Sequence, residues 1–420
     1  MESVNHNKSI FSNTLKIVTG EGIGKIIGII LTPVIARIYG PADMGVLSLF
    51  LTVISILGPF VCLLYTNAIP ICKNERIMYN IVCLCLQILV FFVFALSILL
   101  LLSSESLFAI FELDVLIPYW FFIPISLAFR GVSDILSTLA VRKHLFNSIS
   151  KVLWIQKLFG SLLKIVLGSI GIKPIGLLIG EIVTLFGGIS IYYRKLSAEM
   201  HQYINCISFK RCIFVFYRYS SFPKYRLPSQ ILLSISGNIP NLYFSIVFGM
   251  EMLGNFSMAR TMLAIPISVI GSAVSKSFLG ELSKIKTKDK NEFYSIVMSI
   301  AKKMFILGFL YSSIVYISAP LLFTLIFGSQ WTQAGIFAQL LSITLLFQMI
   351  YSPLEEGVFN VFEKQKYVLL IELIRIFIIG LSLSLAYLFE MPDNLTVLCY
   401  SIGLTIQYMT GTIFLYKIIK

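Results

Sequence analysis

Twelve apolar stretches, each long enough to cross a lipid bilayer, recur along this sequence from one end to the other. A helix needs about 20 mostly apolar residues to span the hydrocarbon core. The stretches cover residues 17–38, 44–70, 77–102, 115–140, 149–171, 174–193, 228–248, 254–280, 296–327, 332–353, 367–389 and 395–416. We therefore expect an all-α, polytopic membrane protein with about twelve transmembrane helices.

The composition excludes a soluble globular protein of this size. Hydrophobic residues make up 57% of the 420 residues and charged residues only 13%, whereas soluble domains contain roughly 45–50% apolar and about 25% charged residues. The net charge of +13 is better explained by basic loops that hold a membrane protein in one orientation than by nucleic-acid binding. We expect no nucleic-acid partner and no separate soluble domain.

The residue types that hold metals or carry out catalysis are scattered. The three histidines form no cluster, and no two of the seven cysteines form a CxxC pair. The sequence contains no Walker loop, no GxSxG motif and no Cys–His arrangement. We expect no cofactor, no metal site and no enzymatic activity.

Basic residues concentrate in every second loop. They follow the predicted second, fourth, sixth, eighth, tenth and twelfth helices, whereas the other loops are short and acidic or neutral apart from Lys173. The basic residues are Lys73, Arg76, Arg142, Lys143, Lys151, Arg194, Lys195, Lys210, Arg211, Arg218, Lys284, Lys286, Lys288, Lys290, Lys364, Lys366, Lys417 and Lys420. Because basic loops remain on the cytoplasmic side, this alternation predicts that both termini are cytoplasmic.

The two halves of the chain share a short repeat. One copy, YGPADMGVLSL at Tyr39–Leu49, joins the first and second predicted helices, and the other, FGMEMLGNFSM at Phe248–Met258, joins the seventh and eighth. The identical residues are Gly40 with Gly249, Gly45 with Gly254, and Ser48 with Ser257. The repeat predicts two six-helix halves related by an axis along the membrane normal. The predicted boundaries are an N-terminal bundle at 1–200, a basic cytoplasmic connector at 201–227 and a C-terminal bundle at 228–420.

Three glycines recur at every fourth residue of the first predicted helix, at Gly20, Gly24 and Gly28. Small residues at this spacing let another helix approach closely. We interpret them as a packing surface in preference to a functional site.

Charged residues inside the predicted spans are costly in hydrocarbon and normally face a polar cavity or a partner. Three pairs share a helix face and are therefore able to neutralise themselves. They are Glu21 with Lys25, Arg130 with Asp134, and Glu372 with Arg375. Internal salt bridges are slightly favoured for these pairs over contacts with a ligand.

Three other basic residues have weaker local compensation. Lys157 and Lys164 lie seven residues apart on one helix face without an acid, and Glu181 on the next helix is able to serve one of them. Arg260 has no local partner. An excess of positive charge inside the membrane indicates an anionic ligand, and arginine and lysine both suit phosphate. We expect these three basic residues to face one cavity and to contact phosphates.

The sequence also bears on the energy source. Without an ATP-binding motif, movement of a ligand would be driven by an ion gradient, the membrane potential or the gradient of the ligand itself. The membrane-embedded acids of the first half, Glu21, Asp134 and Glu181, are the candidates for ion coupling.

The run from Gly22 to Pro70, with TPVIARIYGPADMGVLSLF followed by a helix ending in TNAIP, resembles the polysaccharide biosynthesis or O-antigen flippase (Wzx-type) family. This family belongs to the multidrug/oligosaccharidyl-lipid/polysaccharide exporter superfamily. The later segments FGMEMLGNFSMARTMLAIP and IFGSQWTQAG are similar to the same family, and the resemblance extends to the length, the helix count and the half-repeat.

The resemblance implies two six-helix bundles around a central cavity. It further implies that undecaprenyl-pyrophosphate-linked oligosaccharide, an O-antigen or similar repeat unit of lipopolysaccharide synthesis, is flipped across a bacterial plasma (inner) membrane by alternating access. Membrane lipids, a polysaccharide polymerase and chain-length proteins are the implied partners. The candidate substrate-binding residues are Lys25, Arg37, Arg130, Lys157, Lys164 and Arg260.

Two rival functions remain open from the sequence. A drug/cation antiporter of the same superfamily would be expected to carry acids in its cavity rather than bases. A membrane polysaccharide polymerase or ligase would be expected to carry a large outward loop, whereas the large polar segments here lie on the predicted cytoplasmic side.

Overall fold

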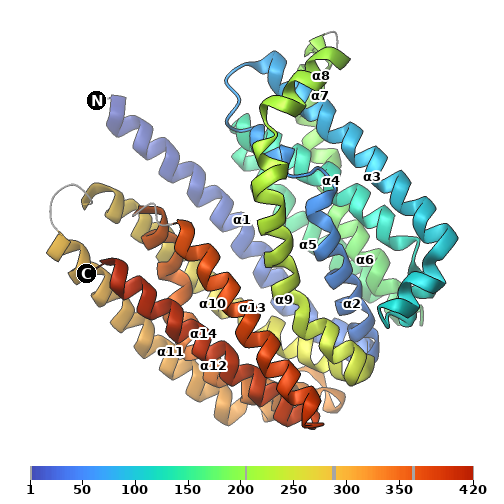
Figure 1. Ribbon diagram of the computed structural model, residues 1–420, viewed down its shortest axis with the longest axis vertical. Helices are drawn as coiled ribbons and strands as arrows, with labels where there is room; N and C mark the ends of the chain where they lie inside the picture. Colours follow the sequence, from blue (N-terminus) through green and yellow to red (C-terminus); the bar gives the residue numbers. More distant parts are fainter. Residues whose placement is uncertain (1, 204–205, 286–289, 362–364, 420) are drawn as a thin grey trace. The chain divides into compact units, whose positions relative to one another are not determined.

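The computed structural model describes residues 2–203, 206–285, 290–361 and 365–419, and these residues form helices and turns without a β-strand (Figure 1). Within this described part, ten helical segments are long and apolar enough to cross a membrane. The predicted all-α, polytopic membrane class is therefore confirmed.

The first and seventh predicted spans correspond to α1 (Glu2–Ile38) and α9 (Leu227–Val247). Both segments are helical, but neither is among the ten that qualify as spans by length and hydropathy. Both carry polar side chains along the helix, which include Lys25 on α1 and Asn241 on α9. α1 and α9 occupy the same position in the two halves of the repeat.

The chain forms two compact units. The first comprises residues 1–39 and 46–235, and the second comprises 40–45 and 236–420, so the division falls within α9. The first unit contains α1, most of α2 (Pro41–Leu57), α3 (Glu75–Ile110), α4 (Phe122–Arg142), α5 (Phe146–Ser169), α6 (Ile175–Phe186), α7 (Ile189–Tyr203) and α8 (Phe209–Arg218). The second contains α10 (Gly249–Ile285), α11 (Lys290–Phe327), α12 (Thr332–Val361), α13 (Gln365–Leu388) and α14 (Asp393–Ile419). The boundaries drawn from the sequence, with a connector at 201–227, remain a prediction.

In the first unit, α5 packs against both α1 and α6. A β-carbon at Gly20 would lie 2.3 Å from Ser150 Oγ on α5, and one at Gly24 would lie 3.1 Å from the Leu153 carbonyl oxygen. The predicted packing surface of α1 is thus confirmed for these two glycines. It is wrong for Gly28, which has no neighbouring atom within 4 Å of a β-carbon.

Two predicted helices of the first unit are interrupted. The helix expected at 44–70 ends at Leu57, and 3₁₀ turns at Gly58–Phe60 and Tyr65–Ala68 follow it. Pro59 lacks an amide hydrogen and therefore cannot continue the hydrogen-bond ladder. The helix expected at 174–193 is divided between α6 and α7, with two glycines at the break.

Lys143, the residue after α4, joins the ends of three helices of the first unit. Its Nζ atom lies 2.8 Å from Glu75 at the start of α3 and 2.6 Å from Glu199 near the end of α7. Partial burial lowers the pKa of Lys143, but the hydrogen bonds to Glu199 and Glu75 outweigh burial and raise the pKa above its usual value. The ends of α3, α4 and α7 therefore lie together at one surface of the unit.

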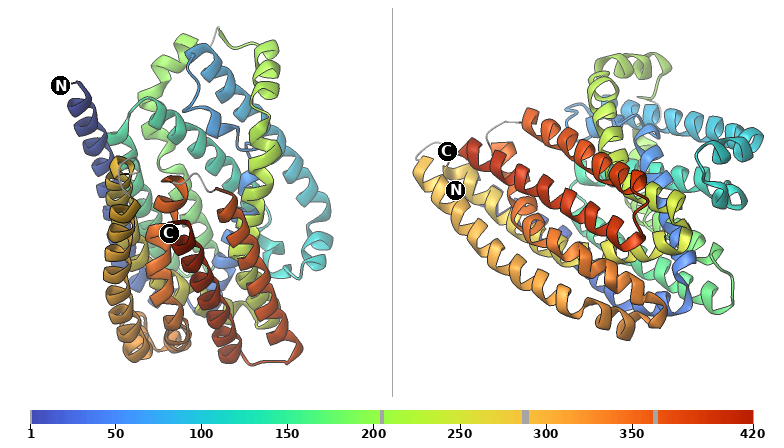
Figure 2. Two further views of the ribbon diagram at one scale, coloured as in Figure 1. Left: turned by 60° about the vertical axis from the view of Figure 1, so that its left-hand side comes forward. Right: turned by 60° about the horizontal axis from the view of Figure 1, so that its bottom comes forward.

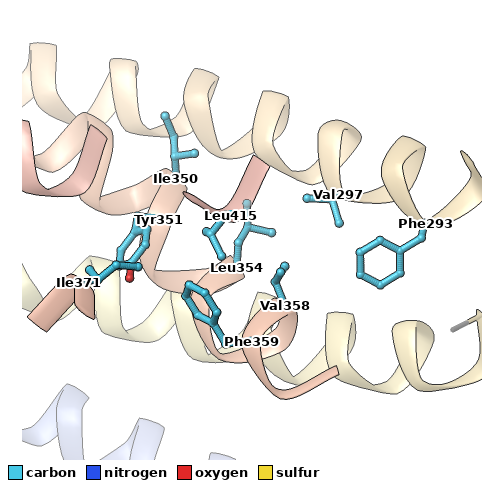
Figure 3. Close-up of a cluster of buried hydrophobic side chains, with 9 residues drawn as sticks. All are labelled: Phe293, Val297, Ile350, Tyr351, Leu354, Val358, Phe359, Ile371 and Leu415. Carbon is cyan, nitrogen blue, oxygen red and sulfur yellow. The ribbon is translucent and has the colours of Figure 1, made fainter. Parts of the chain in front are cut away.

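In the second unit, α12 contacts α10, α11 and α14, and α13 packs on α14. These five helices run side by side along much of their length (Figures 1 and 2). A cluster of buried apolar side chains from α11 to α14 joins four of them (Figure 3). The cluster consists of Phe293, Val297, Ile350, Tyr351, Leu354, Val358, Phe359, Ile371 and Leu415.

The two copies of the repeated motif contact each other within the second unit, to which residues 40–45 belong. A β-carbon at Gly45 would lie 1.9 Å from the Met250 carbonyl oxygen, and a β-carbon at Gly254 would lie 1.8 Å from the Pro41 carbonyl oxygen. Gly45 and Gly254 are equivalent positions of the repeat, as are Pro41 and Met250. The contact is therefore reciprocal, and only glycine fits at its two closest points.

Candidate functional site

Lys164 on α5 and Glu181 on α6 form a buried ion pair. The Lys164 Nζ and Glu181 Oε2 atoms are 2.6 Å apart, and the two side chains are 12% and 16% exposed. The helices approach closely here because a β-carbon at Gly180 would lie 2.3 Å from Lys164 Cγ. The structure confirms that Glu181 serves one of the two lysines. Glu181 therefore offsets much of the charge that Lys164 could offer to another anion.

Lys157, two turns earlier on α5, differs from Lys164. Its side chain is exposed, and it forms no ion pair among the residues that the structure describes. Glu181 is near enough to interact with Lys157 electrostatically, but its carboxylate is already bonded to Lys164. Lys157 therefore retains more uncompensated charge than its neighbour.

Two candidate basic residues, Lys25 and Arg37, lie on α1. Lys25 Nζ lies 2.8 Å from Glu21 Oε1 one turn away, with side-chain exposures of 26% and 41%. The expectation of an internal salt bridge is therefore confirmed for this pair. Arg37 is exposed in the last turn of α1, where a cation is favoured by the negative end of the helix dipole.

Arg130 on α4 contacts the end of α2. Its Nη1 atom donates a hydrogen bond to the Ile54 carbonyl oxygen at 3.3 Å, whereas its Nε atom is 4.0 Å from Asp134 Oδ2. The last four carbonyl groups of a helix lack intrahelical partners, and a cation near them is stabilised by the helix dipole. Arg130 therefore has a structural role where α2 ends at Leu57, which the sequence did not reveal.

Arg260 on α10 carries a charge that neutral groups hold in place. Its Nη1 atom donates to Asn241 Oδ1 at 3.1 Å and its Nη2 atom to the Gly237 carbonyl oxygen at 3.4 Å. The guanidinium carbon lies 5.4 Å from the centre of the Phe256 ring. No acid lies within ion-pair distance in the described part of the chain. The structure thus orients the cation without cancelling its charge.

A second arginine of the same unit, Arg375 on α13, was interpreted from the sequence as one half of a self-neutralising pair. Its Nη1 atom is 3.5 Å from Glu372 Oε2, and both side chains are 21% exposed. The Nε atom is buried and has no hydrogen-bond partner among the described residues. Tyr408 on α14 lies within electrostatic range of both Arg375 and Arg260. Because Tyr408 is distant from both in sequence, no spacing rule could have identified this neighbourhood.

A groove of about 350 Å³ lies between α11 and α12 of the second unit. Its lining residues are Phe309, Ser312, Ser313, Tyr316, Ile317, Ser342, Ile343, Leu346 and Phe347. None of them is charged, and Ser312 donates its hydroxyl hydrogen to the Ser342 carbonyl oxygen at 2.6 Å. The groove therefore lacks the positive charge that an anionic head group requires.

The candidate residues consequently form separate sets. In the first unit, Lys157, Lys164 and Glu181 lie together, while Lys25 and Arg130 have their own acidic neighbours on α1 and α4. Arg260 belongs to the second unit. A single phosphate site composed of Lys157, Lys164 and Arg260 remains a prediction.

We expect replacement of Glu181 by glutamine to lower the stability of the protein strongly. The change leaves the buried Lys164 ammonium without a counter-charge, and breaking a buried ion pair in this way costs about 3–5 kcal/mol. Thermal unfolding of the purified protein in detergent measures the effect. Glu21→Gln is the matched control, because its pair is more exposed and should lose much less. Equal losses for the two variants would contradict the structural role of Glu181.

Comparison with known proteins identifies the family. Residues 34–336 match the profile of a family described as polysaccharide biosynthesis protein. The chain belongs to this family. The resemblance seen in the sequence is thus confirmed, and the matched segment contains the half-repeat and five of the six candidate basic residues.

Several solved structures are similar to this chain in fold. The chain is similar to the lipid II flippase MurJ in an inward closed conformation, with a TM-score of 0.72, 14% identity, and coverage of 95% of this chain and 87% of that one. It is also similar to an inward-facing multidrug resistance MATE family transporter of the MOP superfamily, with a TM-score of 0.68, 15% identity, and coverage of 96% and 94%.

A MOP superfamily transporter from Pyrococcus furiosus is a third structural relative, with a TM-score of 0.56, 14% identity, and coverage of 98% and 95%. No curated protein matches the chain in sequence. At these identities the structural likeness establishes the fold, and the family membership together with the fold supports a membrane transporter or flippase.

Proposed function

We propose that this protein is a flippase that moves an undecaprenyl-pyrophosphate-linked oligosaccharide across the bacterial plasma membrane by alternating access. The observation that carries the proposal is Arg260, an arginine on a membrane-spanning helix whose charge is held by Asn241 and Gly237 instead of an acid. A charged group is expensive in hydrocarbon unless it is paired. Arg260 therefore suits a ligand that brings its own negative charge.

A pyrophosphate head group has this property. It carries roughly two negative charges and does not cross hydrocarbon unaided, because burial of an unpaired charge is very costly. The planar guanidinium of arginine binds phosphate through two parallel hydrogen bonds. Membership of the polysaccharide biosynthesis family supports a sugar-bearing substrate, and one relative in fold is described as a lipid II flippase.

A polar side chain on the first helix of the second half supports the same proposal. Intramembrane polar residues generally face a polar cavity or a partner, and Asn241 on α9 is such a residue. Arg260 donates directly to Asn241 of α9. We propose that Asn241 and Arg260 line the path of the polar head group.

The test uses cells that lack the gene for this protein. We expect such cells to lose surface polysaccharide and to accumulate the lipid-linked precursor, and the wild-type protein to restore both. A drug/cation antiporter would instead change tolerance to lipophilic cations and leave polysaccharide intact. A polymerase or ligase would leave translocated precursor on the outer leaflet. Either of these outcomes would reject the proposal.

Coupling to an ion gradient is part of the proposal. Glu21 and Glu181 are bonded to lysines, and Asp134 lies beside Arg130. A carboxylate that exchanges its basic partner for a proton or sodium ion would link ion movement to rearrangement of the helices. We expect simultaneous change of Glu21, Asp134 and Glu181 to the neutral amides to abolish gradient-driven transport in vesicles. Unchanged transport by a folded variant would remove these acids from the mechanism.

The orientation is proposed with both termini in the cytoplasm, on the basis of the alternating basic loops. Reporter fusions after Arg218 and Lys286 are expected to read cytoplasmic, and a fusion after Glu251 is expected to read external. An external signal after Arg218 would contradict the orientation and the parallel arrangement of the two halves.

A further inference from the structure

The segment expected to be a polar connector contains an amphipathic helix, α8, with the sequence FKRCIFVFYR at Phe209–Arg218. Its ten residues are too few to span a membrane. It contains both aromatic and basic residues, and no Asp or Glu occurs anywhere between Glu199 and Glu251. The function proposed above makes no use of this helix.

One side of α8 is fixed to the start of α3. Cys212 and Val215 are buried, and the two helices pack together. Asn80 of α3 organises the approach, since its Nδ2 atom donates to the Cys206 carbonyl oxygen at 3.2 Å and its Oδ1 atom accepts from the Ser208 amide at 3.1 Å. The Tyr65 hydroxyl also donates to the Phe216 carbonyl oxygen at 2.9 Å. The helix is therefore held by specific bonds.

The adjacent side of α8 is apolar and uncovered. Phe209, Ile213 and Tyr217 follow one another at four-residue spacing, which places them on one stripe of the helix. Their side chains are 72%, 43% and 70% exposed. Water is a poor solvent for such a stripe, and large exposed apolar patches mark sites that bind a protein or a membrane.

The remaining side of α8 is basic. Arg211 and Arg218 are seven residues apart, so they lie on the same stripe, and both are exposed. The Arg218 guanidinium lies 5.7 Å from the Phe214 ring centre. Lys210, Lys224 and Arg226 add three further exposed basic residues within or just after the helix. An apolar stripe on one side of a helix and a basic stripe on another is typical of helices that lie in the plane of a membrane surface.

The attachment of α8 to α3 sets the depth of α8 in the membrane. α3 is kinked at Ser103, and its part before the kink, which begins at Glu75, is about 42 Å long, against about 30 Å for the hydrocarbon core. A centred helix of that length enters the core about 6 Å from either end. Asn80 lies five residues into α3, or about 7.5 Å along its axis, which is close to the boundary between the lipid head groups and the hydrocarbon core.

We propose that α8 is an interfacial helix that binds the anionic phospholipids of the membrane surface beside α3. Phe209, Ile213 and Tyr217 insert between lipid chains, and Arg211 and Arg218 contact phosphate groups. Charge complementarity selects this occupant, because a segment free of acids that carries five basic residues is attracted to an anionic surface and not to a neutral one. The inference does not depend on which substrate the protein transports.

The experiment measures amide hydrogen exchange of α8 in the full-length protein. The protein is placed in nanodiscs of phosphatidylcholine alone and in nanodiscs that also contain phosphatidylglycerol. We expect exchange over 209–218 to be at least about tenfold slower in the anionic nanodiscs, because each basic residue near such a surface contributes about fivefold in binding. High salt should remove most of the difference.

The variant Arg211→Gln/Arg218→Gln should lose most of the lipid-dependent protection. Lys302→Gln/Lys303→Gln is the matched control, since it removes two exposed charges from α11 and should leave α8 unchanged. Thermal unfolding confirms that each variant is folded. Equal exchange in the two lipids, or protection that survives loss of both arginines, would overturn the proposal. Protection that appears only when a nanodisc holds two copies of the chain would assign the helix to self-association and would also overturn it.

Discussion

Cells that carry Arg260→Ala in place of the wild-type protein are expected to lose surface polysaccharide although the protein remains inserted and abundant. The change removes the guanidinium group of Arg260. In the described part of the second unit, Arg260 is the only candidate basic residue, and it is held by hydrogen bonds to neutral groups and not by an acid. Loss of one partner from a desolvated, hydrogen-bonded charge contact typically costs 2–5 kcal/mol, or about 30-fold or more in affinity. Polysaccharide at the cell surface and protein in the membrane fraction are measured together.

Three further variants separate charge from structure. Arg260→Lys should retain partial function, because the charge survives while the planar donor fork is lost. Asn241→Ala should cause an intermediate loss, since Asn241 orients the guanidinium without itself bearing charge. Arg194→Ala removes an exposed arginine from α7 and should have no effect. Normal polysaccharide with Arg260→Ala would disprove the phosphate site even if the flippase assignment stood.

Gly45→Ala and Gly254→Ala are each expected to destabilise the protein strongly. A β-carbon at either position would lie within 2 Å of a carbonyl oxygen of the other repeat copy, and this contact is with backbone, which cannot turn aside as a flexible side chain can. Overpacking of a close contact costs about 1–3 kcal/mol and occasionally more, and a clash with backbone belongs to the upper end. Apparent melting temperature in detergent and transport in cells are the two measurements.

The reciprocal geometry makes a sharper prediction for the double variant. Once one alanine has separated the two segments, the second should cost much less, so the two losses should not add. Gly28→Ala and Gly380→Ala are matched controls, because no atom lies within 4 Å of a β-carbon at either position. Additive losses, or alanine tolerated at both Gly45 and Gly254, would contradict a close contact between the two copies.

The sequence predicted the features that depend on local pattern. Runs of apolar residues identified the membrane class, and the repeat identified the two equivalent glycine positions, Gly45 and Gly254. Glu181 was recognised as a potential partner of Lys157 or Lys164 because it lies on the next helix. These inferences succeeded because the length of a span and the cost of a buried charge are already determined by residue type.

Features that depend on contacts between distant segments were not predicted. The ion pair of Arg130 with Asp134, predicted from the spacing, is present at 4.0 Å, but the hydrogen bond of Arg130 to Ile54 on α2, 76 residues away, was not predicted. The end of α2 beside Gly58 creates unpaired carbonyl groups, and nothing near Arg130 in sequence signals them. The neighbourhood of Tyr408 likewise depends on how α14 packs.

The connector illustrates a different kind of miss. Its basic residues were correctly noted and explained by orientation, which accounts for the charge but not for Phe209 and Tyr217 among them. An apolar stripe of only ten residues is shorter than a span, so a search for membrane crossings passes over it. Periodicity within the segment was the signal that could have found it.

Transbilayer movement of the substrate in proteoliposomes tests the central claim most directly. The purified protein is reconstituted with a fluorescent undecaprenyl-pyrophosphate oligosaccharide, or with the same lipid joined to its sugar without phosphate, and the fraction that reaches the opposite leaflet is measured over time. We predict rapid movement of the pyrophosphate lipid by the wild-type protein, none by Arg260→Ala, and none of the neutral lipid by either. Movement of both lipids at equal rates, or of neither, would contradict a flippase that recognises its substrate through phosphate.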